Sequence, residues 1–201
     1  MESHAVPTEL LLAPGNRAIE QSSNRASMKP IVFLNFDDVL AVHKLHNGFR
    51  VLDAAAMAII DALPDLWLNV VDAEARRNLQ MLHREFLPSY VISSSWISHL
   101  NREQTSKMLK RCGLKFVALN LCEHWCTPRA DTSGRLIEIE AWLELHASEN
   151  KPAYVIIEDS VSGGALSGSW LEERTVFCDA WVGFTAAKLT TARKILQDQG
   201  I

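Results

Sequence analysis

Residues 31–38 have the sequence Ile-Val-Phe-Leu-Asn-Phe-Asp-Asp, four apolar residues followed within four positions by one amide and two carboxylates. A short apolar run of this kind is typical of a strand that is buried on both faces of a sheet. Similar runs occur at residues 90–92, 116–119, 154–157 and 175–178. The sequence therefore predicts five buried strands.

Stretches with helical periodicity lie between these runs. Residues 73–87 place Leu79, Leu82 and Phe86 on one face, follow Asp72 as an N-cap, and end before Pro88. Three more helices are predicted: one that starts at an Asn101–Gln104 capping box and ends near Gly113, one along Leu136, Ile139 and Leu143, and one over residues 186–199. Alternating strands and helices favour an α/β fold with a mainly parallel five-stranded sheet and helices on both faces.

Length and local composition predict the domain boundaries. A chain of 201 residues is the size of one ordinary domain. Residues 1–27 contain prolines and polar residues without a sustained period, so we expect a flexible leader followed by one domain over residues 28–201. The segment 43–72, between the first two strands, is long enough for a helix and a flap. We predict a small cap insertion there.

The overall composition excludes several classes of protein. With 48% apolar residues, 22% charged residues and a net charge of −4, the chain has neither the composition of a disordered protein nor a strong nucleic-acid signal. Its apolar runs are far shorter than the roughly 20 residues of a membrane span. Four cysteines are too few for a disulfide scaffold, and the first residues lack the features of a signal peptide. These features predict a cytoplasmic protein with no membrane partner.

Polar side chains follow three of the predicted strands. Asn35 and Asp37 come after the first, Ser93 after the second, and Glu158 and Asp159 after the run at 154–157. In parallel sheets ligands bind beyond the carboxyl ends of the strands, where these side chains converge. Carboxylate oxygens suit Mg²⁺, and hydroxyl groups bind phosphoryl oxygens. This set of residues predicts a phosphoryl-transfer site.

A cation for the phosphate is available near residue 135. Arg135 opens a predicted helix just after the turn at residues 132–134, where its guanidinium is able to bind a phosphate in a bidentate fork. Arg129 lies close by in the sequence and is the alternative phosphate ligand. The sequence does not decide between the two arginines.

The order of these motifs resembles the four motifs of the haloacid dehalogenase (HAD) superfamily. The run Ser93–Trp96, the helix that opens at Arg135 and the closing Val182-Gly183-Phe184-Thr185 are similar to HAD-like domains found alone or near RNA-repair proteins. The resemblance covers about residues 30–198. It implies a Rossmann-like core and Mg²⁺-dependent hydrolysis of a phosphomonoester through an aspartyl-phosphate.

The resemblance also implies a role for each candidate residue. Asp37 matches the general acid/base, with its backbone carbonyl on the metal, while Ser93 and Arg135 match the phosphate-binding positions. Glu158 and Asp159 match the metal-binding acids, and which of them is the direct ligand stays open. Asp38 stands where glycine is more common.

Asn35 departs from the family pattern. It falls on the position of the aspartate that attacks phosphorus and binds the metal, and an amide performs the first task hardly at all. Two interpretations follow: a HAD-type phosphohydrolase that is inactive or trapped because of Asn35, or a degenerate module that binds a phosphorylated ligand without turnover. The expected ligand is a phosphorylated small molecule or a phosphorylated polymer end.

Other residues of interest receive structural interpretations. Cys122, His124 and Cys126 offer three metal donors, but their spacing is not that of a zinc ribbon or finger, and no second cysteine pair follows. We expect Ser94 and Ser95 to bind local backbone groups and Trp96 to serve core or cap packing.

Overall fold

The computed structural model describes residues 28–42, 64–129, 134–148 and 151–201. The predicted leader, residues 1–27, lies outside these ranges. Of the predicted cap at 43–72, only residues 64–72 are described, and they contain helix α3, Pro64–Val70.

The described ranges contain one five-stranded sheet in which every strand pair is parallel, with the order β3-β2-β1-β4-β5. Its strands are β1 Ile31–Leu34, β2 Ser89–Ile92, β3 Leu121–Cys126, β4 Tyr154–Asp159 and β5 Thr175–Cys178. β1 is central, and all four of its residues are buried. The parallel α/β sheet is therefore confirmed, and four of the five predicted runs lie in its strands.

The prediction of a strand at residues 116–119 is wrong. That run lies in helix α6, Lys115–Leu119, and the strand follows it as β3. Val117 is fully buried while Leu119 is 66% exposed, which is the pattern of an amphipathic turn. A four-residue apolar run does not distinguish the two structures. β3 itself lies at the sheet edge with its middle exposed, so it has no continuous apolar run.

The predicted helices are present with nearly the expected limits. They are α4 Ala73–Phe86, α5 Arg102–Arg111, α7 Arg135–Ala147 and α8 Ala186–Gln197. The Asp72 carboxylate accepts hydrogen bonds from the first turn of α4, and Asn101 and Gln104 form the predicted capping box of α5. The described part of the chain contains no helix with the length and apolar character of a membrane span.

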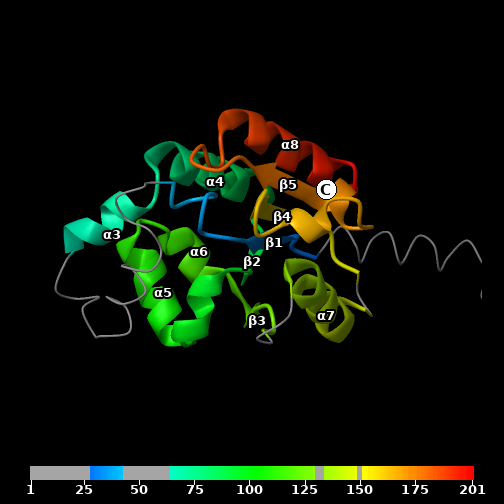
Figure 1. The fold of residues 1–201 in the computed structure, drawn as a ribbon, viewed down its shortest axis with the longest axis horizontal. Helices are drawn as coiled ribbons and strands as arrows, with labels where there is room; N and C mark the ends of the chain where they lie inside the picture. Colours follow the sequence, from blue (N-terminus) through cyan, green and yellow to red (C-terminus); the bar gives the residue numbers. More distant parts are fainter. Residues whose placement is uncertain (1–27, 43–63, 130–133, 149–150) are drawn as a thin grey trace, which may run out of the picture.

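Helices cover both faces of the sheet because alternate residues of the central strands point in opposite directions. Val32 and Leu34 of β1 belong to the larger core, which also contains residues of α4, α5 and α8. Phe33 lies in the second core and meets Trp142 of α7 in an edge-to-face contact at 5.2 Å between ring centroids. Figure 1 shows α4 and α8 side by side at the top and α7 at the lower right.

The segment after β5 packs against the loop that follows β1 and forms a backbone hydrogen bond with it. The backbone N–H of Phe184 donates to the Val39 carbonyl at 2.9 Å, and the Phe184 ring is fully buried. Gly183 has φ +79°, and a Cβ there would lie 2.6 Å from Val42 Cγ1. Only glycine therefore allows this close approach without displacing the loop.

Candidate functional site at the carboxyl edge of the sheet

Three polar segments meet at the carboxyl ends of the central strands. The backbone N–H of Asn35 donates to Ile157 of β4 at 3.1 Å, and that of Ser93 donates to Leu34 of β1 at 2.9 Å. The strand pairing thus continues one residue beyond β1 and β2. It places Asn35 beside β4 and Ser93 beside β1, as expected for a site at this edge.

The Asn35 side chain is held by three hydrogen bonds. Its Oδ1 accepts from the Phe36 backbone N–H at 2.8 Å. Its Nδ2 donates to Asp159 Oδ2 at 2.8 Å and to the Asp37 carbonyl oxygen at 3.2 Å. Asn35 is 1% exposed, so this network lies in the interior. The structure therefore unites three of the predicted site residues around one amide nitrogen.

Asp159 is the acid that reaches Asn35. β4 extends through Asp159, so Glu158 and Asp159 are the last two strand residues rather than residues after the strand. Asp159 Oδ1 accepts from the backbone N–H groups of Val161 and Ser162, both at 2.8 Å, and Oδ2 also accepts from the Ser162 hydroxyl at 2.6 Å. Ser162 is a site residue that the sequence analysis missed.

Asp37 is held by two side chains from the segment after β2. Its Oδ2 accepts from Trp96 Nε1 at 3.0 Å and from Ser95 Oγ at 3.3 Å. Ser95 therefore contacts the site rather than a local backbone group. Trp96 packs in the core as expected, with its ring 5.1 Å from that of Phe36, and its indole N–H also contacts the site. Burial raises the pKa of Asp37, and the charges of Asp38 and Asp159 add to this, while the two hydrogen bonds oppose it.

Asp38 joins the site loop to the segment after β5. It has φ +54°, a left-handed backbone conformation that glycine adopts freely and that aspartate tolerates better than most other residues. Its Oδ1 accepts from the backbone N–H of Trp181 at 2.9 Å, and Trp181 also has a positive φ of 66°. A hydrogen bond thus joins two residues with left-handed backbone conformation at the edge of the site.

Ser93 directly follows β2, and its side chain is buried. Its Oγ is buried and, within the described ranges, makes no hydrogen bond. A buried hydroxyl without a partner costs free energy unless a ligand or water supplies one. The neighbouring Ser94 behaves as expected, because its Oγ accepts from the Trp96 backbone N–H and caps the short 3₁₀ helix Ser95–His99.

Arg135 lies in a buried cluster of charges. Its Nε lies 2.8 Å from Glu158 Oε2, and one terminal nitrogen donates to Glu138 Oε2 at 2.6 Å. Burial raises the pKa of Glu158 well above its usual range, although the Arg135 guanidinium opposes this. Arg129, the alternative phosphate ligand, lies 3.8 Å from Glu138 and donates to the Ser94 carbonyl at 3.4 Å. Both arginines thus border the site, and Glu138 lies beside each of them.

The residues as they stand do not fit a Mg²⁺ ion. Mg²⁺ requires oxygen ligands at near-octahedral positions, whereas Asn35 directs its nitrogen toward the oxygens of Asp37 and Asp159. Glu158 is turned toward Arg135. Across the ranges that the structure describes, no three acidic, histidine or cysteine side chains are grouped so that they could hold a metal.

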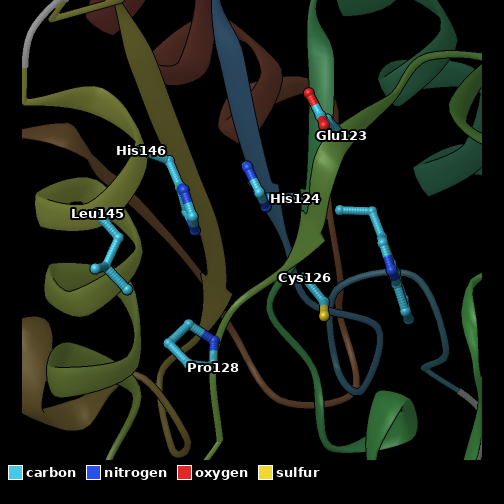
Figure 2. A pocket seen from close by; sticks show the side chains of 7 residues that line it. Glu123, His124, Cys126, Pro128, Leu145 and His146 are labelled. Atoms are coloured by element: carbon cyan, nitrogen blue, oxygen red, sulfur yellow. The ribbon is translucent and has the colours of Figure 1, made fainter.

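The motif of Cys122, His124 and Cys126 lies elsewhere, on β3. A cavity of about 250 Å³ lies between β3 and α7, and its lining includes His124, Cys126 and His146. Figure 2 shows these side chains from close by. The two imidazole rings stack with centroids 3.7 Å apart. The described residues form no group of three metal donors here either, and the cavity shares no residue with the site described above.

Comparison with known proteins identifies the family. The family described as "HAD domain in Swiss Army Knife RNA repair proteins" matches residues 31–189, which is more than three quarters of the chain. Neither the curated proteins nor the solved structures include a match. The matched range contains every candidate site residue, and the HAD resemblance and the Rossmann-like α/β fold are confirmed. The chain belongs to the family of HAD domains of Swiss Army Knife RNA repair proteins.

Proposed function

We propose that this HAD domain binds the phosphate group of a phosphomonoester at the carboxyl edge of its sheet and holds it without hydrolysis. The observation that carries the proposal is the set of hydrogen bonds made by the side chain of Asn35, the residue at the nucleophile position. Its oxygen accepts a hydrogen bond from Phe36, and its nitrogen donates to Asp37 and Asp159. By the HAD resemblance, Asp37, Ser93 and Arg135 stand at the positions of the acid/base and the phosphate-binding groups.

An amide in this state does not attack phosphorus. The nitrogen lone pair is delocalised into the carbonyl, and both N–H bonds point at acceptors. The amide oxygen is a far weaker nucleophile than a carboxylate oxygen. No aspartyl-phosphate forms without an aspartate, so we expect the bound phosphate ester to persist.

Three groups on separate segments support phosphate binding. Ser93 provides a buried hydroxyl that has no partner among the described residues. Asp37, whose pKa is raised by burial, is suited to carry a proton and to donate it in a hydrogen bond to the ester oxygen. Arg135, or Arg129 beside it, provides positive charge for the non-bridging oxygens.

The proposed ligand is a phosphorylated small molecule or the phosphorylated end of a polymer. The family description names RNA repair, so a terminal phosphate of an RNA strand is the first ligand to test. The chain carries a net charge of −4, which does not favour binding along a nucleic-acid backbone. We therefore expect a short phosphorylated oligoribonucleotide to bind, and the same strand without its phosphate to bind far more weakly.

The test is the variant Asn35→Asp, assayed with a generic phosphomonoester in the presence and absence of Mg²⁺. The exchange keeps the size of the side chain and restores a carboxylate. We expect hydrolysis by the variant only, and only with Mg²⁺, while the wild-type chain binds the ester without turnover. Release of inorganic phosphate measures activity, and calorimetry with inorganic phosphate measures binding.

Two results would contradict the proposal. Equal hydrolysis by both chains would mean that a group other than residue 35 attacks phosphorus. Phosphate binding by neither chain, with both folded by circular dichroism, would mean that the site does not bind phosphate. The variant Ser93→Ala tests the binding role of this residue, because it removes a buried hydroxyl that has no partner among the described residues and leaves the contacts of Asn35 in place.

A further inference from the structure

The amide nitrogen of Asn35 lies between two oxygens that belong to different parts of the chain. One is the backbone carbonyl of Asp37, at 3.2 Å, and the other is Oδ2 of Asp159, at 2.8 Å. In the HAD resemblance these are two of the groups expected to face the metal. The nitrogen thus stands next to the oxygens that a divalent cation would otherwise join.

The orientation of this amide follows from its neighbours. The Phe36 backbone N–H is a donor and requires an acceptor, which Asn35 Oδ1 provides at 2.8 Å. The oxygens of Asp37 and Asp159 are acceptors and require donors, which the two N–H bonds provide. Turning the amide over would set N–H against N–H at Phe36 and oxygen against oxygen at Asp159.

Asp159 is also fully hydrogen bonded. Its two oxygens accept from the backbone N–H groups of Val161 and Ser162, from the Ser162 hydroxyl and from Asn35. A carboxylate offers about four lone-pair directions, so each direction has a partner. A metal at Asp159 would have to displace one of these donors.

We propose that the Asn35 amide takes the place of the divalent cation, so that the site binds a phosphate monoester without Mg²⁺. This inference rests on the proposed function. Two effects of the side chain support it. Asparagine removes one negative charge relative to aspartate, and its two N–H bonds supply the partial positive charge that a cation would bring to Asp37 and Asp159. With aspartate at position 35, two carboxylates would face each other here, and a cation would be needed to offset their repulsion.

The inference is tested by titrating Mg²⁺ alone into the protein, followed by calorimetry with inorganic phosphate with and without Mg²⁺. Wild type is expected to bind Mg²⁺ at least about tenfold more weakly than Asn35→Asp, which gains a carboxylate facing Asp159. Phosphate is expected to bind wild type with the same affinity, within about twofold, with or without Mg²⁺. Asn35→Asp is expected to bind phosphate markedly more tightly with Mg²⁺.

The matched control is the double variant Asn35→Asp/Asp159→Asn, which exchanges the two side chains. It has the net charge of wild type and retains an amide–carboxylate pair in reverse order. We expect it to bind Mg²⁺ as weakly as wild type, since it also has one carboxylate in this pair. Mg²⁺ affinity equal to that of Asn35→Asp would mean that the position of the carboxylate, rather than the loss of the amide, decides metal binding, and would overturn the inference.

Two results for the wild-type protein would overturn the inference. Mg²⁺ binding by wild type as tight as that by Asn35→Asp overturns it, and so does phosphate binding that appears only with Mg²⁺. Absence of phosphate binding under both conditions contradicts the proposed function instead. In that case Mg²⁺ binding by Asn35→Asp alone still supports the exchange of amide for cation.

Discussion

The guanidinium of Arg135 lies 2.8 Å from the carboxylate of Glu158, and both side chains are buried. Arg135 is the first residue of α7, and Glu158 is the penultimate residue of β4. Glu138, one turn along α7, adds a second buried carboxylate. This ion pair therefore joins the start of α7 to the edge of the sheet where the candidate site lies.

Arg135→Ala is expected to destabilise the protein by about 3–5 kcal/mol, because it breaks a buried ion pair and leaves Glu158 without the guanidinium that it faces. The free energy of unfolding in urea measures the effect. Arg129→Ala is the matched control, since its side chain is 35% exposed and lies 3.8 Å from Glu138. That variant is expected to cost less than about 1 kcal/mol. Equal losses would show that burial of the Arg135 pair does not matter.

Asp37→Asn, introduced into Asn35→Asp, is expected to slow hydrolysis of an ester with a poor leaving group by about 10² to 10⁴-fold. The reason is that an amide does not protonate the leaving oxygen, whereas Asp37 has a pKa raised by burial. Binding of phosphate should change much less than turnover. Undiminished hydrolysis would remove Asp37 from the role of general acid.

Trp96→Phe in the same Asn35→Asp background is expected to raise the pKa of Asp37 further, because the indole N–H stabilises the ionised carboxylate. A general acid works in its protonated form. The high-pH limb of the rate profile should therefore move to higher pH, and the pH dependence of kcat measures it. An unchanged limb would mean that the limb reports another group.

His83 is expected to make stability fall as the pH falls. Burial, and to a lesser degree the charge of Lys29, lowers the pKa of His83, whose Nδ1 lies 3.2 Å from the Tyr90 hydroxyl. The unfolded chain then binds a proton at higher pH than the folded chain does. The contribution of His83 to the free energy of unfolding is therefore complete above a pH of about 6.5 and is lost as the pH falls below it. Urea midpoints at about pH 8 and pH 5.5 should differ less for His83→Gln than for wild type. Equal pH dependence in both proteins would exclude His83 as the cause.

Gly183→Ala is expected to cost distinctly more than Gly168→Ala. Both glycines have a positive φ, 79° and 75°, so both variants carry the strain of about 1–2 kcal/mol of an alanine in the left-handed region. A Cβ at 183 also lies 2.9 Å from the Val39 carbonyl oxygen, while at 168 it meets no atom within 4 Å. The difference in thermal unfolding midpoint isolates this contact. A difference near zero would mean that the loop moves aside at no cost.

Local sequence patterns predicted most of the fold. Strands β1, β2, β4 and β5 contain runs of apolar residues because both of their faces are covered. A strand that is buried on two faces is recognisable in the sequence by such a run. The capping box of α5 is a contact between residues three apart, so it is visible without a structure. β3 was not predicted because its middle residues are exposed and it therefore has no continuous apolar run, whereas β5, at the other edge, is almost fully buried.

The candidate site residues were predicted from the ends of these strands, because parallel strands bring their carboxyl ends to one edge of the sheet. The hydrogen-bond partners of these residues were not predicted. The hydrogen bond from Asn35 to Asp159 joins residues 124 positions apart, and the one from Trp96 to Asp37 joins residues 59 apart. Such contacts depend on strand order and on the rotamers that packing allows.

The sequence by itself determined the alternation of strands and helices, the residues that stand at the strand ends and the presence of an amide at position 35. Tertiary structure alone decided that the Asn35 nitrogen faces Asp37 and Asp159, that Glu158 turns to Arg135, and that the Ser93 hydroxyl has no partner within the described ranges. The physical reason is range. Hydrophobic periodicity is a local property of the chain, whereas the direction of a buried donor is set by whichever acceptors the folded chain brings beside it.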